Sequence, residues 1–232
     1  MTPERFDIYD ERQNWIGTAP RHEVHAQGYW HRSFHCWLVR DEGEQRMVLF
    51  QRRRDTKDTF PGCYDITAAG HLTAGEQLHE ASRELEEELG VAVPFEALTY
   101  LLTVKQQLQG EVRGVPFIDN EISAVYGLCV DQPLEAYTLQ ASEVDSLYEV
   151  PLNELLALFR GQTDRVKATG IQAENEDSGD HGPLSVADEG SSGSAFPFKR
   201  VIRQVRAADF VPHGTTYYTE ILEALHHVPG CP

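Results

Sequence analysis

A cluster of glutamates at helical spacing carries the strongest chemical signal in the sequence. Residues 76–89, EQLHEASRELEEEL, are strong helix formers without Gly or Pro, and Gly90 follows where a helix-ending glycine is expected. Drawn at about 100° per residue, this helix places four carboxylates on one side: Glu80, Glu84, Glu87 and Glu88. Apolar residues that can pack on a sheet line another side: Leu78, Ala81, Leu85 and Leu89.

Two interpretations of this acidic face are open. Like charges at such spacing destabilise a helix by roughly 0.2–0.5 kcal/mol per pair, and a bound divalent cation would relieve the repulsion. Carboxylate oxygens are hard ligands that suit Mg²⁺ or Mn²⁺. A solvated acidic surface is the alternative, because runs of Glu are common on exposed helices. The helix alone does not choose between the two.

The residues that flank the helix complete a longer pattern, which resembles the Nudix box. That box reads as a glycine, five residues, a glutamate and a spacer, followed by Arg-Glu-aliphatic-any-Glu-Glu-any-Gly-aliphatic. The first part is matched by Gly70 and Glu76. The second part is matched by Arg83, Glu84, Leu85, Glu87, Glu88, Gly90 and Val91. The spacer 77–82 is one residue shorter than usual in the family, which leaves the glutamate face intact.

This resemblance implies a metal-dependent hydrolase that cleaves a diphosphate linkage in a small phosphorylated substrate. The metal, Mg²⁺ or Mn²⁺, would be bound by three carboxylates: Glu84, Glu87 and Glu88. Gly70 would bring the backbone close to the metal, and Arg83 would support the site by pairing with Glu76. A bound divalent ion neutralises the diphosphate and lowers the pKa of a bound water.

The general base that removes a proton from the attacking water has three candidates: Glu84, Glu87 and Glu121. Family members differ in which carboxylate they use, so the box does not decide among them. Glu121 follows Asp119-Asn120 at the start of a predicted strand, 121–130. A glutamate in that position can equally be a solvated side chain.

Other segments resemble the isopentenyl-diphosphate-isomerase-like branch of the family: 7–10 (DIYD), 17–19 (GTA), 22–25 (HEVH), 30–35 (WHRSFH) and 65–71 (DITAAGH). True isomerases bind their metal through histidine and glutamate, and the matching places here are near His25, His31, His71 and Glu121. The true isomerases also carry a catalytic cysteine just before the Gly-His pair, at the position where this chain has Ala69. Because alanine cannot transfer a proton, and Cys63 lies beyond a predicted strand, the sequence favours hydrolysis over isomerisation.

Four histidines lie close together in the N-terminal part: His22, His25, His31 and His35. They could form a zinc site, which needs three or four converging ligands. They could also be half-buried, hydrogen-bonded side chains, since His31 and His35 flank the start of a predicted strand.

A basic run, 51–57 (QRRRDTK), lies at the end of the predicted strand 47–52 and contains three consecutive arginines, Arg52, Arg53 and Arg54. Guanidinium groups bind phosphate bidentately. Neighbours along a strand point to opposite faces, so we expect at least one of the three to contact the diphosphate. Protection of an edge strand by charge is the alternative.

The predicted elements alternate between strands and helices. Strands are expected within 6–17 and at 33–40, 47–52, 64–68, 98–108 and 121–130, and helices at 76–89, 152–160 and 215–228, with a helix or an irregular connection at 20–28. Residues 170–195 are rich in Gly, Ser, Asp and Glu, which predicts a flexible insertion. This order predicts an α/β fold, an α/β/α sandwich with a mixed sheet, in a single domain spanning 1–232.

Composition limits the remaining possibilities. A net charge of −17 disfavours binding to nucleic acid, and it means that an anionic substrate needs cations at the site. No apolar run is long enough to span a bilayer and the N-terminus does not resemble a signal peptide, so a cytoplasmic protein is expected. The four cysteines form no CxxC pair, and we expect reduced, mostly buried thiols: Cys36, Cys63, Cys129 and Cys231.

Three functions therefore compete. The first is a hydrolase acting on a nucleotide-linked or isoprenoid-like diphosphate. The second is an isomerase with an unusual mechanism, and the third is a catalytically silent domain that senses a diphosphate metabolite. The complete set of three box glutamates argues against the third, because binding alone does not need water-activating carboxylates. The resemblance also implies that a homodimer is common.

Overall fold

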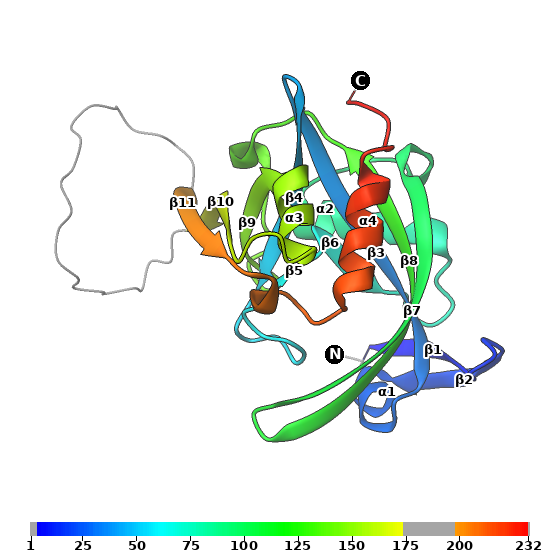
Figure 1. The fold of residues 1–232 in the computed structure, drawn as a ribbon. Helices are drawn as coiled ribbons and strands as arrows, with labels where there is room; N and C mark the ends of the chain where they lie inside the picture. The colour runs from blue at the N-terminus through cyan, green and yellow to red at the C-terminus, as the bar shows by residue number, and fades with distance from the viewer. Residues whose placement is uncertain (1–3, 174–197, 232) are drawn as a thin grey trace.

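The computed structural model describes residues 4–173 and 198–231, which form one mixed sheet with helices on both faces (Figure 1). The strands are β1 (Arg5–Tyr9), β2 (Trp15–Pro20), β3 (Trp30–Glu42), β4 (Gln45–Arg53), β5 (Tyr64–Asp65), β6 (Ala68–His71), β7 (Thr99–Val112), β8 (Val115–Cys129), β9 (Val144–Pro151), β10 (Val166–Ala173) and β11 (Phe198–Val205). The α-helices are α1 (Arg21–Gln27), α2 (Arg83–Leu89), α3 (Leu152–Phe159) and α4 (Thr215–Leu225). Short 3₁₀ turns lie at Leu78–Ser82, Phe95–Ala97, Leu134–Ala136 and Ala207–Asp209. The predicted α/β sandwich is confirmed.

Strand β3 organises the sheet. It pairs antiparallel with β4 at one end and with β6 at the other. It also pairs in parallel with β8, in a register that runs from Trp30 opposite Asn120 to Val39 opposite Cys129. The strand order through the larger part of the sheet is β11-β10-β9-β4-β3-β1-β2. Strand β3 therefore holds together the segments that carry the glycine, histidine and acidic residues singled out in the sequence.

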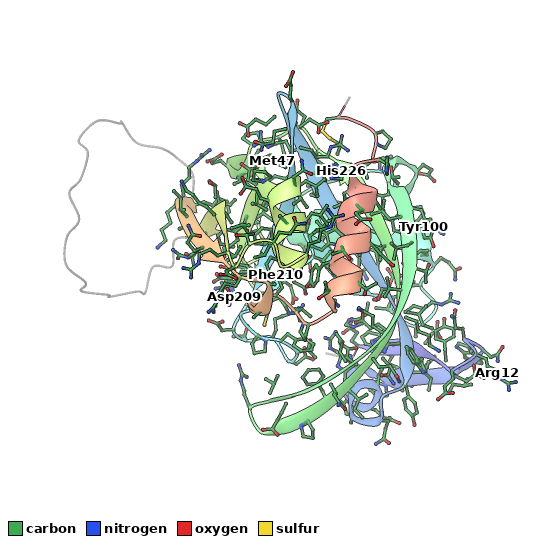
Figure 2. All side chains as sticks on the ribbon, viewed as in Figure 1. Arg12, Met47, Tyr100, Asp209, Phe210 and His226 are labelled. Carbon is green, nitrogen blue, oxygen red and sulfur yellow. A yellow bond between two sulfur atoms is a disulfide. The ribbon has the colours of Figure 1, made fainter. Side chains whose placement is uncertain are left out.

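Alternation along β3 separates the two halves of the core. Trp37 and Val39 belong to a buried cluster with the apolar residues of α3 and α4, whereas Cys36 and Leu38 belong to a cluster with α2. Successive side chains of a strand point to opposite faces, so one strand can anchor helices on both sides. Figure 1 shows α3 and α4 side by side over the near face. Of the residues labelled in Figure 2, Phe210 packs among the core aromatics and Tyr100 is 56% exposed.

Strands β7 and β8 form one long hairpin, which extends beyond the rest of the sheet (Figure 1). Its two-residue turn, Arg113-Gly114, has positive φ at both residues, as a tight hairpin turn requires. The strand predicted for 121–130 in fact begins at Val115, so Glu121 lies inside a strand and not at its start. The polar composition of 109–116 hid this continuation, because both faces of a projecting hairpin can be solvated.

Two predicted elements are divided in the structure. The helix expected for 76–89 is a 3₁₀ turn, Leu78–Ser82, followed by the α-helix α2. The strand expected for 64–68 is divided into β5, which pairs with β4, and β6, which pairs with β3. Between them the Thr67 hydroxyl donates a hydrogen bond to Leu49 O and accepts one from Leu38 N–H, so the chain crosses from one neighbour to the other without leaving these groups unpaired.

The later elements agree with the sequence except at their ends. The helix predicted for 152–160 is α3, and the closing helix predicted for 215–228 is α4, which ends at Leu225. The first four residues of the predicted insertion 170–195 are not a loop, because they pair with β11 as the end of β10. The rest of that prediction lies outside the described residues.

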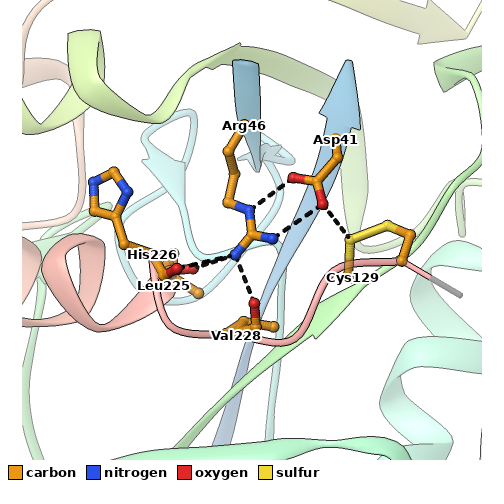
Figure 3. The surroundings of a disulfide bond; sticks show 7 residues. Asp41, Arg46, Cys129, Leu225, His226 and Val228 are labelled. Carbon is orange, nitrogen blue, oxygen red and sulfur yellow. Dashed lines mark hydrogen bonds and ion pairs between the residues drawn. A yellow bond between two sulfur atoms is a disulfide. The ribbon is translucent and has the colours of Figure 1, made fainter. Parts of the chain in front are cut away.

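The expectation of four reduced thiols is wrong. Cys129, at the end of β8, and Cys231 form a disulfide, whereas Cys36 and Cys63 are free. Arg46 lies beside this disulfide and donates hydrogen bonds to the carbonyls of Leu225 and Val228, as Figure 3 shows. The two cysteines are 102 residues apart in the chain, so only the packing of α4 on the sheet brings them together.

Among the described residues, no helix has both the length and the apolar composition needed to cross a membrane.

Candidate active site

The site is built around the contact between β6 and α2. Gly70 in β6 faces the side chain of Glu84, and a β-carbon at residue 70 would lie 2.1 Å from the Glu84 Cδ and Oε1. Such a distance is well inside van der Waals contact, so only glycine allows the strand to approach the carboxylate this closely. The resemblance implied that Gly70 brings the backbone close to a metal; here the residue it lies against is Glu84, one of the expected metal ligands.

Glu88 lies one helical turn beyond Glu84 and is buried. The Gln51 amide donates a hydrogen bond to its Oε2 at 3.1 Å, and the Ala69 N–H donates another at 3.3 Å. Burial, with the nearby Glu84 charge, raises the pKa of Glu88 to about 8, and burial raises the pKa of Glu84 to about 7. A low-dielectric environment disfavours carboxylates that carry uncompensated charge. The pair therefore has the electrostatics of a site that is completed by a cation.

Arg83 links the other acidic residues of the site. Its Nε donates to Glu76 Oε1 at 2.8 Å, and its Nη1 lies 2.9 Å from Glu84 and 3.0 Å from Glu87. Glu76 is fixed in turn by the backbone N–H of Thr73 at 2.7 Å. Burial would raise the pKa of Glu76, but the hydrogen bonds from Arg83 and Thr73 lower it, so this residue remains a carboxylate. The shortened spacer still leaves Glu76 in reach of Arg83.

Glu87 is 51% exposed and shares the cleft with Glu84 and Glu88. Glu80, which an uninterrupted helix would place beside them, is not in that group. Its carboxylate instead accepts the N–H of Gln77 at 2.7 Å. The reason is the 3₁₀ turn, whose tighter winding of about 3.0 residues per turn rotates residue 80 away from the α-helical arc.

A cleft of about 650 Å³ opens over these glutamates. Its charged and polar lining residues are Glu4, Arg21, Arg53, Thr56, Lys57, Asp58, His71, Thr73, Arg83, Glu84, Glu87, Glu88, Gln140, Ser142 and Glu143. The volume is that of a small-molecule site, and the box glutamates lie in its wall.

The three consecutive arginines differ in whether they line the cleft. Arg53 lines the cleft, where it donates to Asp65 Oδ2 at 2.9 Å and to Thr59 O. Arg52 and Arg54 are not part of the lining and pair with Asp145. Of the three, only Arg53 lines the cleft.

A second, smaller chamber of about 50 Å³ adjoins the cleft. Four residues line both spaces: Arg53, Ala69, Gly70 and His71. Deeper in the chamber the walls are formed by Ser33, His35, Thr59, Phe60, Asp65, Ile66, Leu108, Asp119, Glu121, Val211 and His213. The position that would hold a cysteine in an isomerase, Ala69, is thus at the junction of the two spaces.

A cluster of His25, His31, His71 and Asp119 lies beside this chamber, with one ligand atom from each within 4.8 Å of the others. The buried atoms His25 Nε2, His31 Nε2 and Asp119 Oδ1 meet no hydrogen-bond geometry with the described residues, although Asp119 Oδ1 lies 3.4 Å from His31 Nε2 and 3.6 Å from His25 Nε2. Buried polar atoms without hydrogen bonds are costly, and a cation among these three would satisfy them. Only two of the four N-terminal histidines belong to it, because His22 and His35 are not members.

Glu121 lies deep in the chamber and is not a solvated residue. Its carboxylate accepts hydrogen bonds from Ser33 Oγ at 2.7 Å and Ser123 Oγ at 3.2 Å, and His71 Nε2 lies 3.0 Å away. Burial opposes its ionisation, but the hydrogen bonds and charges of His35 and His71 hold the pKa of Glu121 well below its usual range. Glu121 is therefore a carboxylate held by neighbouring histidines, and it lines the chamber but not the cleft.

Comparison with known proteins places this arrangement in a family. The model of the NUDIX domain matches residues 29–169, more than half of the chain. The chain belongs to the Nudix family. An uncharacterized Nudix hydrolase of Clostridium acetobutylicum is 33% identical over 225 residues, which cover 97% of this chain and 98% of the relative. Nudix hydrolase 3 of Arabidopsis thaliana is 40% identical over 158 residues, covering 66% of this chain and 20% of that longer protein.

A solved structure supports the fold assignment. DR0079 from Deinococcus radiodurans has a TM-score of 0.51 and 22% identity, covering 68% of this chain and 90% of that one. The chain is thus a Nudix hydrolase, an enzyme that acts on phosphoric anhydrides. Nudix hydrolases in general use divalent metal ions, and the oxygen-rich, partly buried glutamate set described above fits such an ion.

Several site residues of this Nudix hydrolase were not found from the sequence. The C-terminal segment supplies two of them: His213 Nε2 lies 3.1 Å from Asp65 Oδ1, and Tyr217 OH lies 2.9 Å from His35 Nδ1. Gln51, under Glu88, and Lys57, in the cleft, were also missed as site residues. Lys57 had a visible signal, because it continues the basic run, but nothing local marks His213 or Tyr217.

Proposed function

We propose that this chain is a divalent-metal-dependent hydrolase that cleaves the P–O–P linkage of a small organic diphosphate. One observation carries the proposal: two partly or fully buried carboxylates, Glu84 and Glu88, lie together in the wall of an open cleft beside a glycine that admits them. Burial raises the pKa of both groups, and the charges of Arg83 on Glu84 and of Lys57 on Glu88 offset that rise only in part.

Glu84, Glu87 and Glu88 would hold the ion, which we propose is Mg²⁺ or Mn²⁺ because all the donors are hard oxygens. When bound, the ion neutralises charge on the diphosphate and makes a water more acidic. Glu84 or Glu87 would accept the proton of that water, since both face the cleft. Arg83 holds the two side chains in place through its ion pairs. Attack of the water forms one P–O bond, breaks one P–O bond of the P–O–P linkage, and releases two phosphate-bearing products.

We propose Arg53 as the member of the arginine run that contacts the phosphates. It lines both the cleft and the inner chamber, and its Asp65 partner fixes the guanidinium at their junction. Arg52 and Arg54 would instead stabilise the base of this loop through Asp145.

Phosphorus NMR with Mg²⁺ and a panel of diphosphates tests the function. The panel holds nucleoside triphosphates, nucleotide sugars, dinucleotide cofactors, coenzyme A and isopentenyl diphosphate. Cleavage of at least one compound by the wild type, lost in Glu87→Gln, is the expected result. Glu86→Gln is the matched control, because Glu86 is an exposed glutamate on the same helix outside the cleft. Wild-type rates in Glu87→Gln would contradict the metal assignment, and binding without turnover would favour a sensor.

A second candidate function is isomerisation, and the histidine cluster favours it. His25, His31, His71 and Asp119 would hold a cation beside Glu121, as the resemblance to the isomerase-like branch suggests. Ala69 opposes it, because alanine, at the position of the isomerase cysteine, cannot exchange a proton. Proton NMR of isopentenyl diphosphate would reveal a shifted double bond without phosphate release if isomerisation occurred.

We further propose that residues 1–232 form a single domain. The later elements β9, α3 and α4 share one buried cluster with β3 and β4, so no boundary divides the described core. A single cooperative unfolding transition seen alike by fluorescence and circular dichroism would support this, and two separate transitions would contradict it.

A further inference from the structure

Asp65 is a buried acidic residue that lies before the Nudix box and joins two distant parts of the chain. Its Oδ2 accepts a hydrogen bond from Arg53 Nη1 at 2.9 Å, and its Oδ1 lies 3.1 Å from His213 Nε2. Burial would raise the pKa of Asp65, but the hydrogen bond from His213 and the charge of Arg53 lower it to about 2. Asp65 is therefore a carboxylate that holds one partner on each oxygen.

The contacts of Arg53 leave one N–H group for a ligand. A guanidinium has five N–H groups. In Arg53, Nε and Nη2 donate to Thr59 O, Nη2 also donates to Thr59 Oγ1, and Nη1 donates to Asp65. The second N–H of Nη1 forms no hydrogen bond with any described residue. Because a guanidinium is planar and rigid, the position of the Asp65 carboxylate sets the direction of this remaining N–H.

His213 reaches Asp65 from the segment that precedes α4. The Val211 N–H donates to Tyr64 O at 2.9 Å, so this segment lies along β5. From β7, the amide nitrogen of Gln106 donates to His213 O at 2.7 Å, which places the amide oxygen 2.9 Å from ring Nδ1. Both ring nitrogens therefore face oxygen atoms, to which a protonated ring donates. The ring is held between Gln106 and Asp65 in one orientation.

Burial makes this chain of contacts effective. The side chains of Asp65 and His213 are only 5% and 7% exposed, and that of Arg53 is 14% exposed. In such an environment hydrogen bonds to charged groups are stronger than at the surface, and water does not readily replace a lost donor. A change at His213 is therefore transmitted to Asp65, and from Asp65 to Arg53.

We propose that His213 is a positioning residue for phosphate binding: through Asp65 it fixes the direction in which Arg53 presents its remaining N–H to a phosphate group in the cleft. His213 does not touch the phosphate itself. Its loss should change affinity more than the chemical step, because it acts on a binding contact. This inference rests on the proposed function, since it takes Arg53 as a phosphate contact.

Two substitutions of His213 separate its two hydrogen bonds. In His213→Gln the amide N–H takes the place of ring Nε2 and still donates to Asp65. In His213→Asn the shorter amide takes the place of Nδ1, beside Gln106, and Asp65 Oδ1 loses its donor. The probe is methylenediphosphonate, a diphosphate analogue that cannot be hydrolysed, titrated by calorimetry at fixed Mg²⁺. We expect its Kd to rise about fivefold in His213→Asn and less than about twofold in His213→Gln.

A double-mutant cycle tests whether the effect passes through the arginine. Arg53→Ala alone should raise the Kd of the probe about tenfold or more. Adding His213→Asn to it should cause no further loss, because a residue that acts through Arg53 has nothing to orient once Arg53 is gone. For any compound that the enzyme cleaves, KM should follow the same pattern while kcat stays within about twofold.

His227→Asn is the matched control, because His227 is exposed and lies outside the cleft and the chamber. It should leave Kd unchanged, and circular dichroism checks that each variant is folded. Wild-type affinity in His213→Asn would overturn the inference. So would equal losses in His213→Asn and His213→Gln, or a further loss when His213→Asn is added to Arg53→Ala. Absence of phosphate release from every compound of the panel, with the expected pattern of affinities, would overturn the proposed hydrolase function alone.

Discussion

Gly70 packs so closely against Glu84 that there is no room for a side chain at residue 70: a β-carbon there would lie 2.1 Å from the carboxyl carbon of the glutamate. Gly70→Ala should therefore displace the Glu84 carboxylate from the cleft. We expect hydrolysis to fall by at least about 100-fold, since geometric errors near 1 Å have effects of that size. Activity and circular dichroism measured together check this. Gly230→Ala is the control, because a β-carbon there makes only an ordinary contact, at 3.4 Å from Asp41. Normal activity in Gly70→Ala would mean that Glu84 is not required where it lies.

The stability of the metal-free protein should depend on pH in a defined direction. Burial raises the pKa of Glu88 to about 8 and that of Glu84 to about 7, from 4.5 in an unfolded chain. For these two groups the folded state keeps protons that the unfolded state loses, so their contribution to stability is fully present below pH 4.5 and is lost as the pH rises to about 8. In EDTA, we expect the melting temperature at pH 8 to be lower than at pH 5, by about 5 °C or more.

Adding Mg²⁺ or Mn²⁺ at pH 8 should reverse that loss, because a cation stabilises the ionised carboxylates and binds only the folded state. Scanning fluorimetry with and without the metal measures the effect. Glu88→Gln should flatten the pH profile, since its amide does not ionise. A profile that is equally steep in Glu88→Gln would show that other groups cause the dependence.

The ion pair between Glu76 and Arg83 should matter for both stability and turnover. Glu76→Gln removes the charge that holds Arg83 Nε at 2.8 Å, and we expect a loss of about 1–3 kcal/mol in the free energy of unfolding. Arg83 would then be held only by Glu84 and Glu87, so the three side chains would lose their fixed arrangement and kcat should fall by about tenfold or more. Urea denaturation and initial rates measure the two effects. Glu86→Gln, on the exposed side of α2, should change neither quantity.

Reducing the disulfide should weaken the attachment of the C-terminal segment. The bond between Cys129 and Cys231 closes a loop of about a hundred residues, for which the typical contribution is about 2–4 kcal/mol. Dithiothreitol, or Cys231→Ser, should lower the free energy of unfolding by that amount in urea titrations. Cys63→Ser should retain the response to dithiothreitol, because Cys63 is a free thiol. Equal stability of the oxidised and reduced protein would contradict the prediction.

The sequence was most informative where function needs residues close together in the chain. Arg83, Glu84, Glu87 and Glu88 lie within six residues, and a single turn of helix is enough to gather them. The exact helix type was not visible, because the 3₁₀ turn at Leu78–Ser82 has the same helix-forming composition as α2. That difference moved Glu80 out of the acidic group.

Contacts between distant parts of the chain could not be obtained in the same way. His71 is 40 residues from His31 and 48 from Asp119, and the three meet because β3 pairs with β6 on one side and with β8 on the other. Resemblance to a family indicated which histidines to consider. Their convergence, and the absence of His22 and His35 from the cluster, depend on strand register.

The acidic helix, the glycine before it and the α/β alternation are readable in the sequence, since helical period, turn chemistry and strand period are local properties of a chain. Three features depend on the folded arrangement: Arg53 lines the cleft while Arg52 and Arg54 do not, Glu121 is buried among histidines, and Cys129 meets Cys231. Each of these depends on which strands pair and how α4 packs. Those choices are fixed by the summed burial of the whole core and not by any one segment.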